Sequence, residues 1–82
     1  MDFLKGYVSD DTINTLMNKY TIATLYNFSC NKENVIRVID FFRKIGINNI
    51  DEIMLYNLSV FMDRVEYLEK FNNSELADYI GI

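Results

Sequence analysis

The chain has 82 residues, which fit a single helical domain spanning 1–82. Half of the residues are apolar or aromatic, and this excludes an intrinsically disordered protein. The net charge is −4, and residues 47–82 carry seven acids against two bases, whereas a protein that binds nucleic acid along its whole length should be basic.

The residue inventory also argues against catalysis. The chain has no histidine, so the commonest general base and metal ligand is missing. Three scattered glycines build neither a phosphate loop nor a dinucleotide-binding fingerprint. Cys30 is the only cysteine, and we expect it to be a buried or half-buried turn residue. We therefore expect a protein that is not an enzyme, with no catalytic residues, no metal and no other cofactor.

No segment of the sequence is typical of export or membrane insertion. Residues 1–11 (MDFLKGYVSDD) lack the apolar region of a signal peptide, and no window approaches 18 consecutive apolar residues. We expect a soluble, cytoplasmic protein that does not enter a membrane.

In chain order, the first predicted helix follows Ser9. Ser9 is a suitable N-cap, and the two aspartates after it favour the positive end of a helix. Apolar side chains then recur at helical spacing, at Ile13, Leu16, Met17 and Tyr20. Residues 22–28 (IATLYNF) fit a short helix, a 3₁₀ turn or a strand. We favour a helix, because nothing nearby could pair with a strand.

The strongest periodicity covers residues 31–45, with Asn31 as the expected N-cap. The apolar stripe of this helix consists of Val35, Val38, Ile39, Phe42 and Ile45. Ile36 and Phe41 widen the stripe, so the helix should be central and contacted on more than one side.

Residues 42–53 (FRKIGINNIDEI) contain a turn between two helices. Gly46 fits the left-handed residue that ends a helix, after which Ile47 would fold back against Phe42 in a Schellman motif. A phosphate-binding helix-hairpin-helix turn usually has a second glycine where this chain has Asn48. A helix-capping turn is therefore the favoured interpretation.

Three more helices are predicted after this turn. Asn49 and Glu52 form a capping-box pattern for the first of them. Ser59 can start the second, whose inner face would consist of Phe61, Met62, Val65, Leu68 and Phe71. Asn72 and Glu75 form another capping box, for a terminal helix with Leu76, Tyr79 and Ile80 as its apolar residues.

The chain contains a faint internal repeat. Residues 39–46 (IDFFRKIG) align with residues 65–72 (VEYLEKFN) at an offset of 26. A second alignment, at an offset of 37, pairs Ile13, Leu16, Met17, Ala23 and Leu25 with Ile50, Ile53, Met54, Val60 and Met62. Helical solenoids repeat short helices in this way.

The helix order, with VIDFFRKIGI at 38–47 and IDEIM at 50–54, resembles the repeat of the mitochondrial transcription termination factor family. The resemblance covers roughly residues 8–80 and implies about two units of two helices and a short turn. This chain lacks the family's proline after the first helix, and it is acidic where the nucleic-acid-binding members are basic. The resemblance therefore implies the architecture rather than nucleic-acid binding. The sequence predicts an all-α fold of five or six short helices, packed as a compact bundle or a two-unit helical-repeat fragment.

For function, we expect a non-catalytic protein–protein interaction module, a small acidic regulator or inhibitor that binds a protein partner. The candidate partner-binding residues lie in the acidic C-terminal third and are Asp63, Glu66, Tyr67, Glu69 and Glu75. The alternative is a nucleic-acid-binding module that uses the basic side chains of the 32–46 helix, which are Lys32, Arg37, Arg43 and Lys44.

Six tyrosines suit half-buried and interface positions, since each joins a large apolar area to a polar tip. With Met1 and Phe3, they should leave apolar surface exposed on the monomer. Self-association into a homodimer is the simplest use of such a surface.

Overall fold

The computed structural model describes residues 1–81, and these residues confirm the all-α fold class. Within this range there are six α-helices, two 3₁₀ helices and no β-strand. In chain order the elements are η1 (Asp2–Leu4), α1 (Asp10–Lys19), α2 (Ile22–Cys30), α3 (Lys32–Lys44), α4 (Ile50–Tyr56), η2 (Leu58–Met62), α5 (Val65–Leu68) and α6 (Asn73–Ile80). An isolated bridge between Lys5 and Val8 closes the turn that follows η1.

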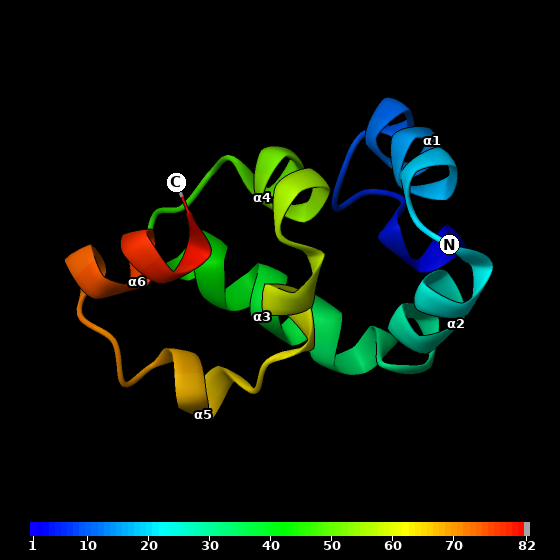
Figure 1. Cartoon of the computed structure of the whole chain (residues 1–82). Coiled ribbons are helices and arrows are strands. Elements are labelled where there is room, and N and C mark those ends of the chain that lie inside the picture. The colour runs from blue at the N-terminus through cyan, green and yellow to red at the C-terminus, as the bar shows by residue number, and fades with distance from the viewer. Residues whose placement is uncertain (82) are drawn as a thin grey trace.

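Helix α3 is the centre of the fold, as its wide apolar stripe predicted (Figure 1). It packs against α2, η2 and α5. The stripe residues Val35, Val38, Ile39 and Phe42 are completely buried, whereas Ile45 at the end of the helix is 39% exposed. Phe42 meets Phe61 of η2 edge to face, with 5.6 Å between the ring centroids. Burying four such side chains contributes roughly 1.5–3 kcal/mol each.

The buried core draws on nearly every element of the chain. Its members are Leu4, Val8, Ile13, Leu16, Phe28, Val35, Val38, Ile39, Phe42, Ile50, Ile53, Met54, Leu58, Val60, Phe61, Leu68, Leu76 and Ile80. The N-terminal segment belongs to this core. Phe3 packs on Phe28 of α2 with 5.8 Å between the ring centroids, and Met1 is half-buried beside it. Met1 and Phe3 are therefore only partly exposed, and most of the apolar surface expected on the monomer comes from other residues, such as Ile22, Tyr26 and Tyr56.

Two predicted helix starts are confirmed by their hydrogen bonds. The Ser9 hydroxyl accepts the N–H of Thr12 and caps α1. At α6 the Asn72 side chain accepts the N–H of Glu75, while the Glu75 carboxylate accepts the N–H of Asn72, which completes the capping box. The helix that was favoured over residues 22–28 is confirmed as α2.

The turn after α3 is the predicted Schellman motif. Gly46 has φ +92°, a left-handed conformation that only glycine adopts at no steric cost. Its N–H donates to the carbonyl of Arg43, and the N–H of Ile47 donates to the carbonyl of Phe42 at 2.9 Å. Ile47 thereby folds back onto the core.

Two other predicted N-cap residues occupy the N-cap position but do not cap the helix with their side chains. Asn31 lies at the N-cap position of α3, but its side chain donates backwards to the carbonyl of Asn27 at 2.8 Å. Asn49 precedes α4 without any side-chain cap, so the capping box with Glu52 does not form. Asn49 has φ −90° and ψ 47°, outside the extended region from which an N-cap side chain reaches the first turn.

The continuous helix predicted from Ser59 to Phe71 was also wrong. The segment begins as the 3₁₀ helix η2, breaks at Asp63 and Arg64, and resumes as the single turn α5. Both residues at the break are extended, with ψ 153° and 141°. The side-chain amide of Asn34 on α3 donates to the carbonyls of Phe61 and Asp63, at 3.2 and 2.8 Å. It thus supplies the donors that an uninterrupted helix would have provided.

Because of this break, the two units of the internal repeat differ in structure. The first unit contains the 13-residue α3, whereas the aligned segment of the second unit contains the 4-residue α5. The resemblance to the mitochondrial transcription termination factor repeat stays a prediction.

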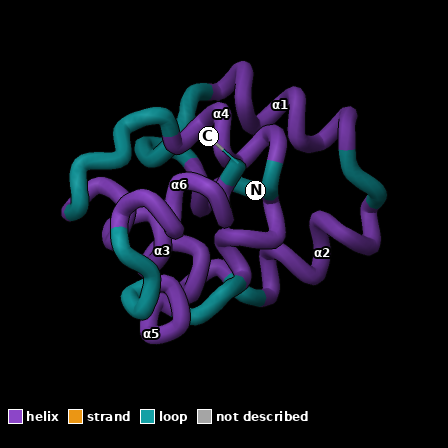
Figure 2. The backbone as a smooth tube through the Cα atoms, turned by 60° about the vertical axis from the view of Figure 1, so that its left-hand side comes forward, coloured by secondary structure: helices purple, strands orange, loops and turns teal. Residues whose placement is uncertain are grey.

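The molecule is elongated, with extents of 33 × 21 × 20 Å. Helices α1 and α2 lie toward one end and α5 and α6 toward the other, joined by α3 (Figure 1). The view turned by 60° shows the same separation of α2 from α5 (Figure 2).

Candidate partner-binding surface

Three aromatic side chains meet at the surface formed by α5, α6 and the loop between them. Tyr67 and Phe71 stand edge to face with 5.3 Å between their ring centroids. Tyr79 stacks on Phe71 at 5.0 Å and meets Tyr67 at 5.9 Å. Tyr67 and Tyr79 nevertheless remain 47% and 39% exposed. We call these three residues the aromatic cluster.

Asp63 fixes the orientation of one ring in this cluster. The Tyr79 hydroxyl donates to the Asp63 carboxylate at 2.6 Å. This hydrogen bond, followed by partial burial and the negative charge of Asp63, raises the pKa of Tyr79 to about 12. The break between η2 and α5 places Asp63 there, because the chain leaves the helical path at that residue.

The candidate acids have three different local roles. Glu66 forms an exposed ion pair with Arg37 at 3.1 Å, and a backbone hydrogen bond together with Arg37 lowers the pKa of this carboxyl. Glu75 is engaged in the capping box of α6. The carboxylate of Glu69 has no hydrogen bond or ion pair with the rest of residues 1–81. Of the predicted residues, the structure therefore brings together Asp63 and Tyr67, joined through Tyr79.

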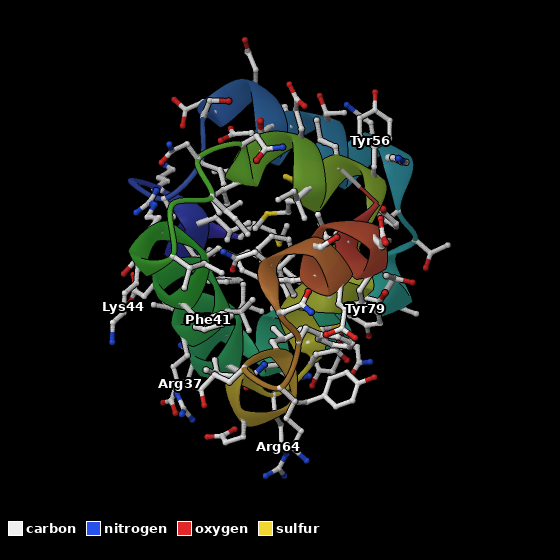
Figure 3. All side chains as sticks on the ribbon, turned by 90° about the vertical axis from the view of Figure 1, so that its left-hand side faces the viewer. Arg37, Phe41, Lys44, Tyr56, Arg64 and Tyr79 are labelled. Atoms are coloured by element: carbon white, nitrogen blue, oxygen red, sulfur yellow. The ribbon has the colours of Figure 1, made fainter. Side chains whose placement is uncertain are left out.

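The basic candidates do not form one free patch. Arg37 is bound to Glu66, and Arg43 donates to the carbonyl of Tyr7 at 2.7 Å with its guanidinium over the Tyr7 ring. Lys44 lines a shallow hollow of about 260 Å³ between α3 and α5, together with Arg37 and residues that include Phe41 and Glu69. Lys32 is exposed in the first turn of α3. In Figure 3, Arg37 and Lys44 project from α3 on the opposite side of the view from Tyr79.

The sequence prediction missed Phe71 as part of this surface, because its spacing assigned it to the inner face of a helix. Tyr79 was expected, with the other tyrosines, at a half-buried or interface position, since a tyrosine hydroxyl favours a half-exposed position with a polar partner. That partner, Asp63, lies 16 residues away and could not be identified from spacing.

Several expected features lie elsewhere or are absent from the described residues. Cys30 is exposed at the end of α2, rather than buried or half-buried as predicted. Within residues 1–81 no three His, Cys, Asp or Glu side chains are grouped as metal ligands would be. None of the helices described is both long and apolar enough to span a bilayer.

A search with this chain found no matching family model, no matching curated protein and no matching solved structure.

Proposed function

We propose that the protein is a non-catalytic protein–protein interaction module that binds an arginine-containing basic segment of a partner on the aromatic cluster. The observation that carries the proposal is the exposure of Tyr67 and Tyr79 within a packed group of three rings. Aromatic side chains are enriched at protein interfaces, because they bury a large area and lose little conformational entropy.

The hydrogen bond from Tyr79 to Asp63 supports this proposal. It fixes the ring of Tyr79 before any partner arrives, and Phe71 stacks on the same ring at 5.0 Å. A surface that is already ordered avoids part of the entropic cost of binding.

The charge around the cluster favours a basic partner. Residues 63–80 carry five acids against two bases, a net charge of −3. The carboxylate of Asp63 lies at the cluster itself, where it accepts the Tyr79 hydroxyl, whereas Glu69 lines the hollow beside Arg37 and Lys44. Arginine fits such a surface best, since its guanidinium stacks on aromatic faces and pairs with carboxylates.

Nucleic-acid binding through α3 has weaker support. Two of its four basic side chains, Arg37 and Arg43, already have protein partners. The acidic residues of α5 also lie beside Arg37. A phosphate backbone would have to displace these contacts and approach the carboxylates.

A peptide-binding assay tests the proposal. The probe is a fluorescein-labelled peptide of alternating arginine and glycine, with a glutamate-and-glycine peptide and a labelled DNA duplex as comparisons. Fluorescence anisotropy should show binding of the arginine peptide alone. Tyr67→Leu keeps apolar area but removes the π-face, and it should weaken binding about fivefold.

Matched charge variants locate the binding site. Asp63→Asn removes the carboxylate at the cluster and should weaken peptide binding, whereas Asp10→Asn removes an equal charge from the exposed start of α1 and should not. Equal effects of the two variants would show attraction to net charge alone and would contradict the proposed surface. Binding of the DNA duplex that is lost on Lys44→Glu would favour the nucleic-acid alternative.

A further inference from the structure

Helix α2 is the element with the most apolar surface left uncovered. Its inner face is anchored, because Phe28 is completely buried and Leu25 and Ser29 are half-buried. Its outer face carries Ile22, which is 87% exposed, Tyr26, which is 72% exposed, and the exposed Cys30. These three residues follow at i, i+4 and i+8, so they form one continuous ridge. We call them the α2 ridge.

The outer face of α2 is also uncharged. Residues 20–31 (YTIATLYNFSCN) contain no Asp, Glu, Lys or Arg, in a chain that is 24% charged overall. Thr21 caps the helix by accepting the N–H of Thr24, so its start is ordered without a charged residue. An exposed apolar surface of this kind is typical of a binding face.

We propose that the α2 ridge binds the α2 ridge of a second copy of this chain across a twofold axis. Each chain carries a net charge of −4, so two copies repel one another wherever acidic surfaces meet, and an uncharged face removes this cost. A twofold contact also requires a surface that complements itself, and the equal spacing of Ile22 and Cys30 on either side of Tyr26 lets two antiparallel copies of the ridge align.

The ridge predicts a definite register. With the axis at Tyr26 and the helices antiparallel, Ile22 of one copy lies beside Cys30 of the other, and the two Tyr26 rings meet at the centre. Ile22 and Cys30 of one chain are eight residues apart, about 12 Å along the helix. The two Cys30 side chains consequently lie on opposite sides of the axis, too far apart for the Cα separation of a disulfide, which is below about 7 Å.

This inference is independent of the proposed peptide binding. Figures 1 and 2 both show α2 far from α5 and α6, and no residue of the aromatic cluster belongs to the ridge. A failure of either proposal leaves the other standing.

Sedimentation equilibrium tests the contact. The wild-type chain should approach twice its 9.7 kDa mass as concentration rises. Ile22→Lys should weaken self-association at least about tenfold, because it places two charges in the interface. Its side chain is exposed in the monomer, so circular dichroism should show an unchanged fold. Ile45→Lys makes the same change at the far end of α3 and should leave the dimer intact. A monomer at every concentration, or equal effects of the two variants, overturns the proposal.

Cysteine cross-linking tests the register. Ile22→Cys adds a thiol that should face Cys30 of the other copy, so mild oxidation should give a covalent dimer on a non-reducing gel. The same treatment should cross-link the wild-type chain poorly. Within one chain the two cysteines are too far apart to pair. Wild-type cross-linking as efficient as that of Ile22→Cys would overturn the register.

Discussion

The hydroxyl of Thr12 donates a 2.7 Å hydrogen bond to the carboxylate of Asp51, across 39 residues of sequence. Thr12 is the only buried polar side chain among residues 1–81. The same carboxylate oxygen accepts the N–H of Ser9 at 2.9 Å, so Asp51 joins the start of α4 to the start of α1. This contact links the two helices in addition to their buried apolar side chains.

Removing the Thr12 hydroxyl should destabilise the fold. Thr12→Val keeps the shape of the side chain but leaves Asp51 without its shortest hydrogen bond. We expect a loss of about 1–2 kcal/mol in the free energy of unfolding, measured by urea denaturation. Thr15→Val is the control, because Thr15 is exposed and its hydroxyl bonds only to the carbonyl of Asp11. Equal losses in the two variants would contradict a bridging role for Thr12.

The same contact predicts a pH dependence. Partial burial raises the pKa of Asp51, but the hydrogen bonds from Ser9 and Thr12 outweigh it, and the pKa lies below its usual value. The stabilisation is therefore present above the ordinary aspartate pKa and is lost as pH falls through the lowered one. Asp51→Asn should lose stability at neutral pH and show a flatter stability profile below pH 4 or so. An acid profile parallel to that of the wild type would contradict this assignment.

Gly46 should be sensitive to substitution for conformational reasons alone. A Cβ at this position would meet no atom within 4 Å, so no steric clash with neighbours contributes. The cost of Gly46→Ala should then be the left-handed backbone penalty, about 1–2 kcal/mol. Gly46→Asn should cost less, because asparagine tolerates this conformation. Thermal denaturation of both variants measures the difference, and identical melting temperatures for Ala, Asn and wild type would contradict the Schellman assignment.

Tyr79 should ionise at a higher pH than an ordinary tyrosine, because its pKa is raised to about 12. Its protonated hydroxyl makes the hydrogen bond, so the stabilisation is present below the ordinary tyrosine pKa and is lost as pH rises toward about 12. Phenolate absorbance should show a late-titrating group that disappears in Tyr79→Phe. Tyr26→Phe removes an exposed tyrosine and should leave the late group in place. Asp63→Asn should shift the pKa of Tyr79 back toward 10.

Asn34→Ala tests the break between η2 and α5. The change leaves the carbonyls of Phe61 and Asp63 without their amide donor and should cost about 1–2 kcal/mol in the free energy of unfolding. It should also lower the pKa of Tyr79, since the position of Asp63 depends on this contact. Asn18→Ala is the control, because its amide bonds only within its own helix. If Asn34→Ala kept both the free energy of unfolding and the pKa of Tyr79 at their wild-type values, Asn34 would not be what holds the break between η2 and α5.

Local signals in the sequence were sufficient for much of the fold. The cap at Ser9, the capping box of Asn72 and Glu75, and the turn at Gly46 depend on residues within six positions of one another, so their patterns could be interpreted directly. The capping box at Asn49 failed because the pattern does not reveal the backbone angles.

The errors with consequences for the site came from contacts distant in sequence. The helix predicted across Asp63 has suitable apolar spacing, but it is broken with the help of Asn34, 29 residues away. The candidate acids were chosen as a charged set, and the structure engages Glu66 and Glu75 in separate contacts. In the aromatic cluster only Phe71 was assigned to an inner helix face, whereas Tyr67 and Tyr79 were expected at half-buried or interface positions.

The placement of α2 and α6 at opposite ends of a 33 Å molecule has a consequence for avidity. A twofold pair joined through α2 would carry two copies of the aromatic cluster pointing away from each other. Such a particle would be bivalent, and a partner with two basic segments on a linker of matching length could occupy both sites at once. The second binding event would then occur at a high effective concentration, and the combined affinity could exceed that of one site by roughly 10²–10⁴-fold.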